Sequence, residues 1–214
     1  IHPDYRGVAS STKTGDIVPL YKEGVFPEKG VIEDRTPPVH HDFYAGYTQD
    51  VISLIDAVKE VEGFAFDKEK IGIWGHSLGG GIAARVAVLR AEVKGYVLFA
   101  PISADAEGNF YELTSGEVYW LRGTYGSAGA EVYEKISPFN YFRDITAPIQ
   151  LHHGTADKDV PLQFSREMYT ELSRLGKKLE FYSYTGQKHE FIEDWPLAAE
   201  RALAFFDLYV KEIR

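Results

Sequence analysis

Apolar residues follow two patterns along this chain, short continuous runs and stretches at helical spacing. Apolar side chains between residues 42 and 62 recur every three or four positions, which predicts an amphipathic helix. Short apolar runs predict four buried strands, at 70–75, 94–100, 148–153 and 179–184. Further helices are predicted at 79–91, 162–175 and 196–213. Strands that alternate with helices predict an α/β fold, a mostly parallel sheet with helices on both faces.

Two segments follow neither pattern. Residues 8–40 are rich in Gly, Pro, Ser, Thr and charged residues, which predicts a loop. Residues 103–143 are aromatic-rich and are predicted to be irregular, with a cap-like insertion at 103–135. Because no repeat or low-complexity tract interrupts the chain, we expect residues 1–214 to form a single domain.

Charge and composition exclude several classes of partner and of catalytic chemistry. A formal net charge of −9 argues against a nucleic-acid partner, because binding phosphates needs a basic surface. The chain has no cysteine, which excludes disulfides, thiolate catalysis and cysteine-ligated metals. No apolar run approaches the roughly 20 residues of a membrane span, so no membrane-spanning helix is predicted.

A glycine-rich turn is predicted where the first strand meets the next helix. Gly75-His76-Ser77-Leu78-Gly79 fits the G-x-S-x-G pattern, which requires that strand–helix context. The turn is expected to be tight and strained, and side chains at positions 75 and 79 would collide with the neighbouring strand and helix. Glycine at both positions avoids these collisions. Ser77 would then lie at the carboxyl end of the sheet, with the Leu78 N–H aimed at an oxyanion. The alternative is a glycine-rich turn that carries an ordinary serine.

A nucleophilic serine needs a base and an orienting acid, which follow it in the chain order Ser, Asp or Glu, then His. Asp157 follows the third predicted strand and His189 follows the fourth. His189 would accept the proton of Ser77, and Asp157 would hold the histidine in the required tautomer. Because both loops follow strand carboxyl ends, these side chains can converge on Ser77.

Other residues compete for these roles. Asp159 is the rival acid, and the rival bases are His40, His41, His76, His152 and His153. His76 is expected to point away from the site, and the histidines at 152 and 153 lie on a strand, which favours a structural role. Two adjacent histidines can bind metal, but no carboxylate at ligand spacing accompanies them, so no metal site is predicted.

Four stretches together resemble a known family: PDYRG at 3–7, GHSLGGG at 75–81, SPFNYFRDITAPIQLHHGTADKDVP at 137–161 and GQKHEF at 186–191. The chain is similar to the prolyl oligopeptidase and dienelactone hydrolase branch of the α/β-hydrolase superfamily. The resemblance implies that Asp157, in the G-x-x-D-x-x-V-P pattern, is the triad acid. It also implies hydrolysis of esters or peptides through an acyl-enzyme, without a metal or organic cofactor.

Within this resemblance we expect a carboxylesterase that acts on a small-molecule ester. The alternative is a peptidase acting on a short peptide, although family peptidases usually carry a large propeller domain upstream. Tyr119, Trp120 and Tyr125 could line a substrate pocket, and they are equally explained as the core of the cap. A non-catalytic interaction module with this fold is the alternative from another class.

The resemblance also implies earlier strands that have no recognisable counterpart in this sequence, together with a second oxyanion N–H. Residues 71–74 would then form an exposed apolar sheet edge. We therefore expect residues 1–214 to be the C-terminal part of a larger fold, completed by a separate N-terminal fragment or chain. Tyr5 is the fallback candidate for the second oxyanion donor, and packing explains a tyrosine there equally well.

Overall fold

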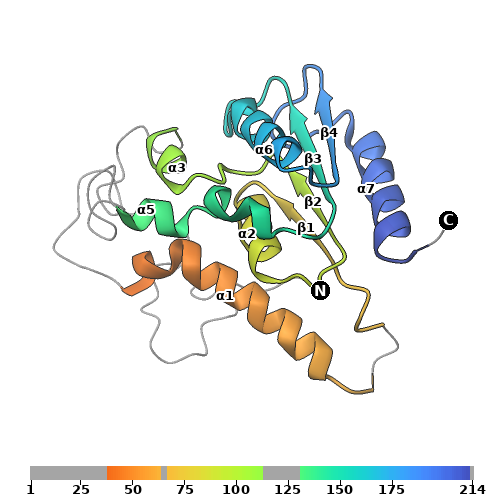
Figure 1. Ribbon diagram of the computed structural model, residues 1–214. Helices are drawn as coiled ribbons and strands as arrows, with labels where there is room; N and C mark the ends of the chain where they lie inside the picture. The colour runs from red at the N-terminus through yellow and green to blue at the C-terminus, as the bar shows by residue number, and fades with distance from the viewer. Residues whose placement is uncertain (1–37, 64–66, 113–130, 213–214) are drawn as a thin grey trace, which may run out of the picture.

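The computed structural model describes residues 38–63, 67–112 and 131–212 (Figure 1). Within these ranges four strands form one parallel sheet in the order β1-β2-β3-β4. The strands are β1 (Gly72–His76), β2 (Gly95–Phe99), β3 (Ile149–Gly154) and β4 (Leu179–Tyr184). The helices are α1 (Pro38–Glu60), α2 (Leu78–Leu89), α3 (Ala106–Glu112), α5 (Glu131–Ile136), the 3₁₀ helix η2 (Pro138–Asp144), α6 (Leu162–Arg174) and α7 (Trp195–Tyr209). The predicted α/β class is confirmed.

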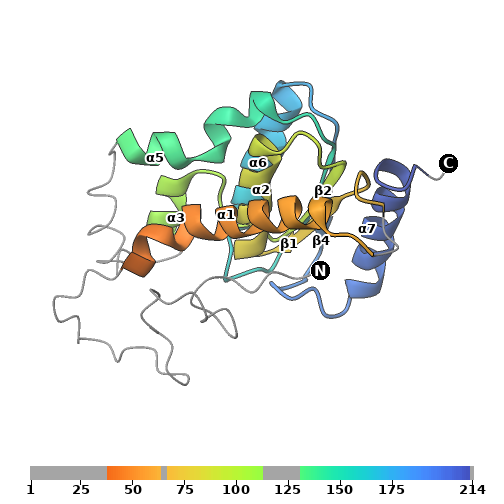
Figure 2. The same ribbon diagram turned by 90° about the horizontal axis from the view of Figure 1, so that it is seen from below.

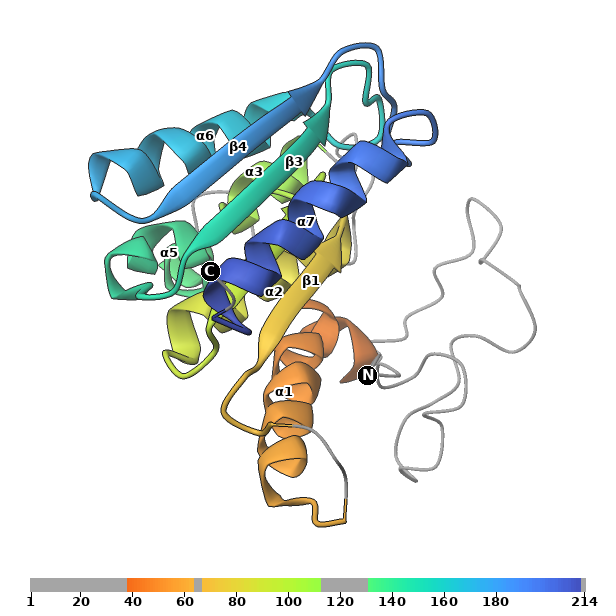
Figure 3. The ribbon, with the colours of Figure 1, turned by 90° about the vertical axis from the view of Figure 1, so that its right-hand side faces the viewer.

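Helices cover both faces of the sheet. Figure 3 shows α7 lying across one face, with α2 and α6 on the other. Strand β2 divides its side chains between the two layers: Tyr96 and Leu98 pack in the larger core cluster, and Val97 and Phe99 pack against α7. Every residue of β2 is buried, as the continuous apolar run predicts for a strand covered on both sides.

The long helix α1 lies beside α2 in the larger layer (Figure 2). Tyr47 and Ile55 are buried in the core cluster and Val51 packs against it, which confirms the predicted amphipathic helix. At 23 residues α1 is long enough to cross a bilayer, but it carries five charged residues, Asp42, Asp50, Asp56, Lys59 and Glu60. No helix in the described ranges is apolar enough over a sufficient length to span a membrane.

In the described part of the chain, β1 has one strand neighbour, β2, and forms an edge of the sheet. Trp74 on this strand is 47% exposed, which is unusual for a tryptophan. The hypothesis that a separate fragment or chain completes the sheet beside β1 stays a prediction.

Two predictions about secondary structure were wrong. Residues 103–143 are not uniformly irregular, because α3, α5 and η2 lie within them. Asp105 begins α3 by accepting hydrogen bonds from the N–H groups of Glu107 and Gly108, a signal that the aromatic composition obscured. The final helix ends at Tyr209 rather than at residue 213.

Candidate active site

Ser77 occupies the turn between β1 and α2. Its backbone has φ 56° and ψ −119°, a conformation that is strained for any residue other than glycine. Its N–H donates to the carbonyl oxygen of Phe99 at 2.9 Å, and its own carbonyl accepts from Ile102 at 3.2 Å. The turn is therefore tied to the carboxyl end of β2, where parallel sheets place their sites.

The glycines of this turn differ in how closely neighbouring atoms approach them. A Cβ at Gly75 would lie 2.3 Å from the carbonyl oxygen of Gly79. At Gly81 a Cβ would lie 2.3 Å from Ile102, and at Gly80 it would lie 2.8 Å from Pro101. A Cβ at Gly79 would meet nothing within 4 Å, so the prediction that Gly79 relieves a collision was wrong. The crowded positions of α2 are those that face the segment following β2.

We expect Gly75→Ala to destabilise the fold by at least about 3 kcal/mol, because the added methyl would overlap a backbone oxygen that cannot move independently. Gly79→Ala is the matched control. It should leave stability within about 1 kcal/mol of the parent or raise it, since alanine is the better helix former. Urea unfolding of both variants measures the difference, and equal destabilisation would contradict the geometric explanation.

Asp157 and His189 are brought together by neighbouring parallel strands. The N–H at Nδ1 of His189 donates to Oδ2 of Asp157 at 2.7 Å. The loops after β3 and β4 are in direct contact, because a Cβ at Gly154 would lie 2.3 Å from the carbonyl oxygen of Gln187. Gly154 is thus required for this close approach.

Hydrogen bonds determine the charge state of this pair. Burial raises the pKa of Asp157, but hydrogen bonds from His153, from His189 and from backbone N–H groups outweigh it and hold the pKa well below its usual range. The hydrogen bond to Asp157 in turn raises the pKa of His189, against a smaller opposing effect of burial. The carboxylate is therefore ionised at neutral pH, and Nδ1 of His189 carries a proton.

Two histidines lie closer to this pair than the sequence predicted. The N–H at Nε2 of His76 donates to the carbonyl oxygen of His189 at 3.0 Å, and the two rings lie 4.5 Å apart. The expectation that His76 points away was wrong, because the loop after β4 returns to the end of β1. Nε2 of His153 lies 3.3 Å from Oδ2 of Asp157, so a carboxylate does accompany the adjacent histidines.

The other rival residues occupy different positions. Asp159 is exposed, and its backbone N–H donates to Oδ1 of Asp157 at 2.9 Å. His152 is fully buried between the Tyr184 hydroxyl and the Gln150 side chain, and burial lowers its pKa to about 3. His40 and His41 lie near the start of α1.

A family model described as the prolyl oligopeptidase family matches residues 44–212. This chain belongs to that family. The match confirms the resemblance and the fold, and it places the chain among serine hydrolases. The matched range includes the Ser77 turn, Asp157 and His189.

The proteins that this member of the prolyl oligopeptidase family resembles include both esterases and peptidases. An isoprenylcysteine alpha-carbonyl methylesterase of Arabidopsis thaliana is 28% identical over 173 residues, 69% of this chain and 40% of that protein. A Pyrococcus horikoshii acylaminoacyl peptidase has a TM-score of 0.69 at 23% identity, with 81% of this chain and 29% of that chain covered. A Thermogutta terrifontis esterase has a TM-score of 0.58 at 23% identity, with 77% and 64% covered. The chain thus spans well under half of the methylesterase and of the peptidase.

Three side chains at this site lie close enough together to be tested as ligands of a metal ion. Ligand atoms of Asp157, Asp159 and His189 lie within 4.8 Å of one another. Oδ2 of Asp157 already accepts from His189, and Oδ1 accepts from two backbone N–H groups. Because the carboxylate is occupied by donors, this arrangement matches a hydrogen-bonded acid–base pair better than a metal cage.

Three further features of the proposed site are the oxyanion donor, the nucleophile's contact with its base, and the substrate pocket. Leu78 is the first residue of α2, so its N–H has no acceptor within the helix. Among the described residues no hydrogen bond joins the Ser77 hydroxyl to His189, and such bonds commonly tighten only with substrate. The pocket and oxyanion candidates Tyr5, Tyr119, Trp120 and Tyr125 lie outside the described residues.

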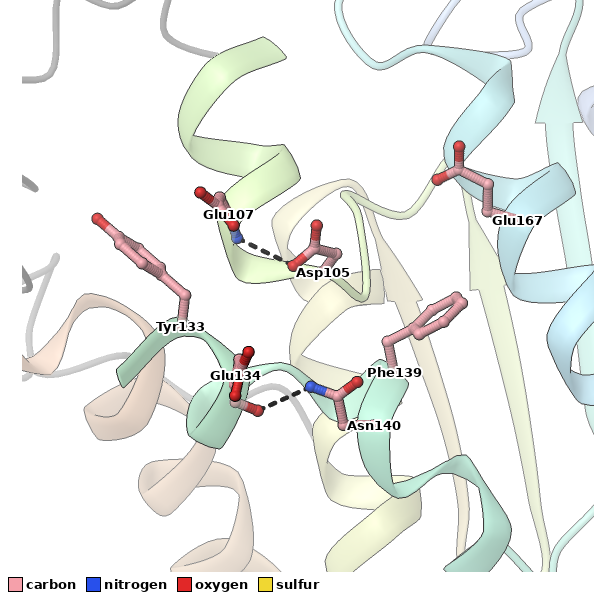
Figure 4. A pocket seen from close by; sticks show the side chains of 7 residues that line it. All are labelled: Asp105, Glu107, Tyr133, Glu134, Phe139, Asn140 and Glu167. Atoms are coloured by element: carbon pink, nitrogen blue, oxygen red, sulfur yellow. Dashed lines mark hydrogen bonds between the residues drawn. The ribbon is translucent and has the colours of Figure 1, made fainter. Parts of the chain in front are cut away.

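A separate hollow of about 320 Å³ lies between α3, α5, η2 and α6 (Figure 4). It is lined by Asp105, Glu107, Tyr133, Glu134, Phe139, Asn140 and Glu167. Asp105 is engaged with the start of α3, and the Glu134 carbonyl accepts from Asn140 at 2.9 Å. None of Ser77, Asp157 and His189 lines this acidic hollow, so it is distinct from the candidate active site.

Proposed function

We propose that this chain carries the catalytic residues of a serine hydrolase, with Ser77 as nucleophile, His189 as base and Asp157 as orienting acid. The main support is the 2.7 Å hydrogen bond between Asp157 and His189, at the same end of the sheet as the strained Ser77 turn. A protonated Nδ1 leaves Nε2 of His189 with the lone pair that a general base requires. A non-catalytic module would have no need for this arrangement.

The reaction would proceed in two steps. Oγ of Ser77 attacks the substrate carbonyl carbon while Nε2 of His189 takes the hydroxyl proton. The N–H of Leu78, at the start of α2, stabilises the negative oxygen of the tetrahedral intermediate. His189 then returns the proton to the leaving group, and water, activated by the same histidine, hydrolyses the acyl-enzyme.

We further propose that the substrate is a carboxylic ester. The curated relative at 28% identity is named as a methylesterase, whereas the likeness to peptidases at 23% identity supports only the fold. A peptidase remains the second candidate, because the matched family is named for its oligopeptidases. Tyr119, Trp120 and Tyr125 stay predicted pocket residues, and the cap at 103–135 stays a predicted insertion.

A substrate screen tests the choice between ester and peptide. The protein is assayed against p-nitrophenyl esters of increasing acyl length and, in parallel, against aminoacyl-p-nitroanilides. We expect hydrolysis of the esters with a clear preference for one range of acyl lengths. Activity confined to the anilides would replace the esterase with the peptidase.

A further inference from the structure

A buried histidine, His153, lies beside Asp157, the acid of the proposed triad. His153, on β3, is fully buried and hydrogen-bonded at both ring nitrogens. Its Nε2 lies 3.0 Å from the carbonyl oxygen of Val160 and 3.3 Å from Oδ2 of Asp157, and its Nδ1 lies 2.7 Å from the Ser165 hydroxyl. A carbonyl oxygen can only accept a hydrogen bond, so Nε2 carries the proton and Nδ1 accepts from Ser165.

We propose that His153 is a positioning residue that holds the Asp157 carboxylate toward His189. The Val160 carbonyl fixes the ring tautomer that this requires, and the Ser165 hydroxyl, donating to Nδ1, holds the ring in place. The proposal rests on the proposed function, because Asp157 has an orienting role only within that triad. The Nε2 proton of His153 faces both the Val160 carbonyl and Oδ2 of Asp157. A continuous series of polar contacts therefore runs from His189 through Asp157 and His153 to Ser165 on α6.

The distribution of donors on Asp157 supports this role. Oδ1 accepts from the backbone N–H groups of Asp159 and Val160, which belong to the same loop and move with it. Oδ2 accepts from His189, which belongs to another loop. Among the described residues, His153 is the one N–H group from a strand of the sheet that approaches this carboxylate, at 3.3 Å from Oδ2. It therefore ties the acid to the rigid part of the fold, which precise orientation requires.

The neighbouring His152 offers a matched control. It lies on the same strand, is equally buried, and is hydrogen-bonded at both ring nitrogens. Successive strand residues point to opposite faces, so its partners are Tyr184 and Gln150 and not Asp157. Replacing either histidine by phenylalanine keeps an aromatic ring in the core and removes its hydrogen bonds. The two losses should cost similar stability, but only one should disturb Asp157.

The test compares His153→Phe, His153→Gln and His152→Phe in the whole chain. Thermal unfolding, ester kinetics and the low-field proton NMR signal of the Asp157–His189 hydrogen bond are measured, the signal being identified by its loss in Asp157→Asn. We expect His153→Phe to lower kcat about tenfold with little change in KM, and to shift or broaden the signal. His153→Gln, whose amide N–H can occupy the place of Nε2, should restore most of both. His152→Phe should leave kcat and the signal unchanged.

Two outcomes would overturn the proposal. The first is a His153→Phe variant with the parental signal and kcat, and the second is an equal effect of His152→Phe on both. If His153→Phe does not fold, Ser165→Ala takes its place, since it keeps the ring but removes the hydrogen bond that holds Nδ1, and an unchanged signal and kcat would then overturn the proposal. The NMR readout needs no turnover, so absence of ester hydrolysis in the parent would contradict the proposed function separately.

Discussion

Ser77→Ala is expected to abolish ester hydrolysis while the protein remains folded. Loss of a serine nucleophile in a triad lowers kcat by about a millionfold, because neither the base nor the oxyanion donor can form the acyl-enzyme. Alanine differs from serine by one hydroxyl, so the strained backbone at φ 56° gains no new collision. The measurement combines p-nitrophenyl ester turnover with covalent labelling by a fluorophosphonate probe, located by mass spectrometry.

Ser183→Ala is the matched control for labelling. Ser183 is an exposed serine on β4, away from the β1–α2 turn, so its variant should label and turn over ester like the parent. Labelling that persists in Ser77→Ala would show that another residue is the nucleophile. Absence of labelling in the parent at neutral pH would favour the non-catalytic alternative.

The sheet could be predicted from the sequence because each strand carries its own signal. The apolar run at 179–184 matches β4 residue for residue, and the runs for β1, β2 and β3 are correct within about two residues at each end. Helix α3 was missed because seven residues are too few for a helical period to emerge from an aromatic-rich segment. The sequence signal for this helix was the capping residue Asp105, which is a single position and not a periodic pattern.

The surroundings of the candidate site could not be predicted in the same way. The contact between His76 and His189 joins residues 113 positions apart, and it depends on the path of the loop after β4 across the sheet. Similarly, the pattern G-x-S-x-G draws attention to Gly79, while the packing of α2 places the constraint at Gly80 and Gly81. Periodicity identifies elements, but these contacts arise only when the elements pack together.

Asp157→Asn is expected to lower kcat for ester hydrolysis by about 10,000-fold, because an amide no longer holds His189 in the productive tautomer. It should also move the acidic limb of the pH–rate profile. The hydrogen bond and charge of Asp157 raise the pKa of His189, and His189 must be neutral to accept the serine proton. Removing that charge lowers the pKa, so the residual activity of Asp157→Asn should persist to lower pH than that of the parent.

The Asp159→Asn variant separates the effect of negative charge near His189 from the effect of orienting its ring. Asp159 and Glu190 also raise the pKa of His189, more weakly than Asp157, and the centre of the His76 ring lies 4.5 Å from that of His189. Asp159→Asn should therefore shift the acidic limb slightly to lower pH while kcat on the plateau stays near that of the parent. Because the backbone N–H of residue 159 still donates to Oδ1 of Asp157, the carboxylate keeps its orientation. A larger loss of kcat in Asp159→Asn than in Asp157→Asn would assign the orienting role to Asp159.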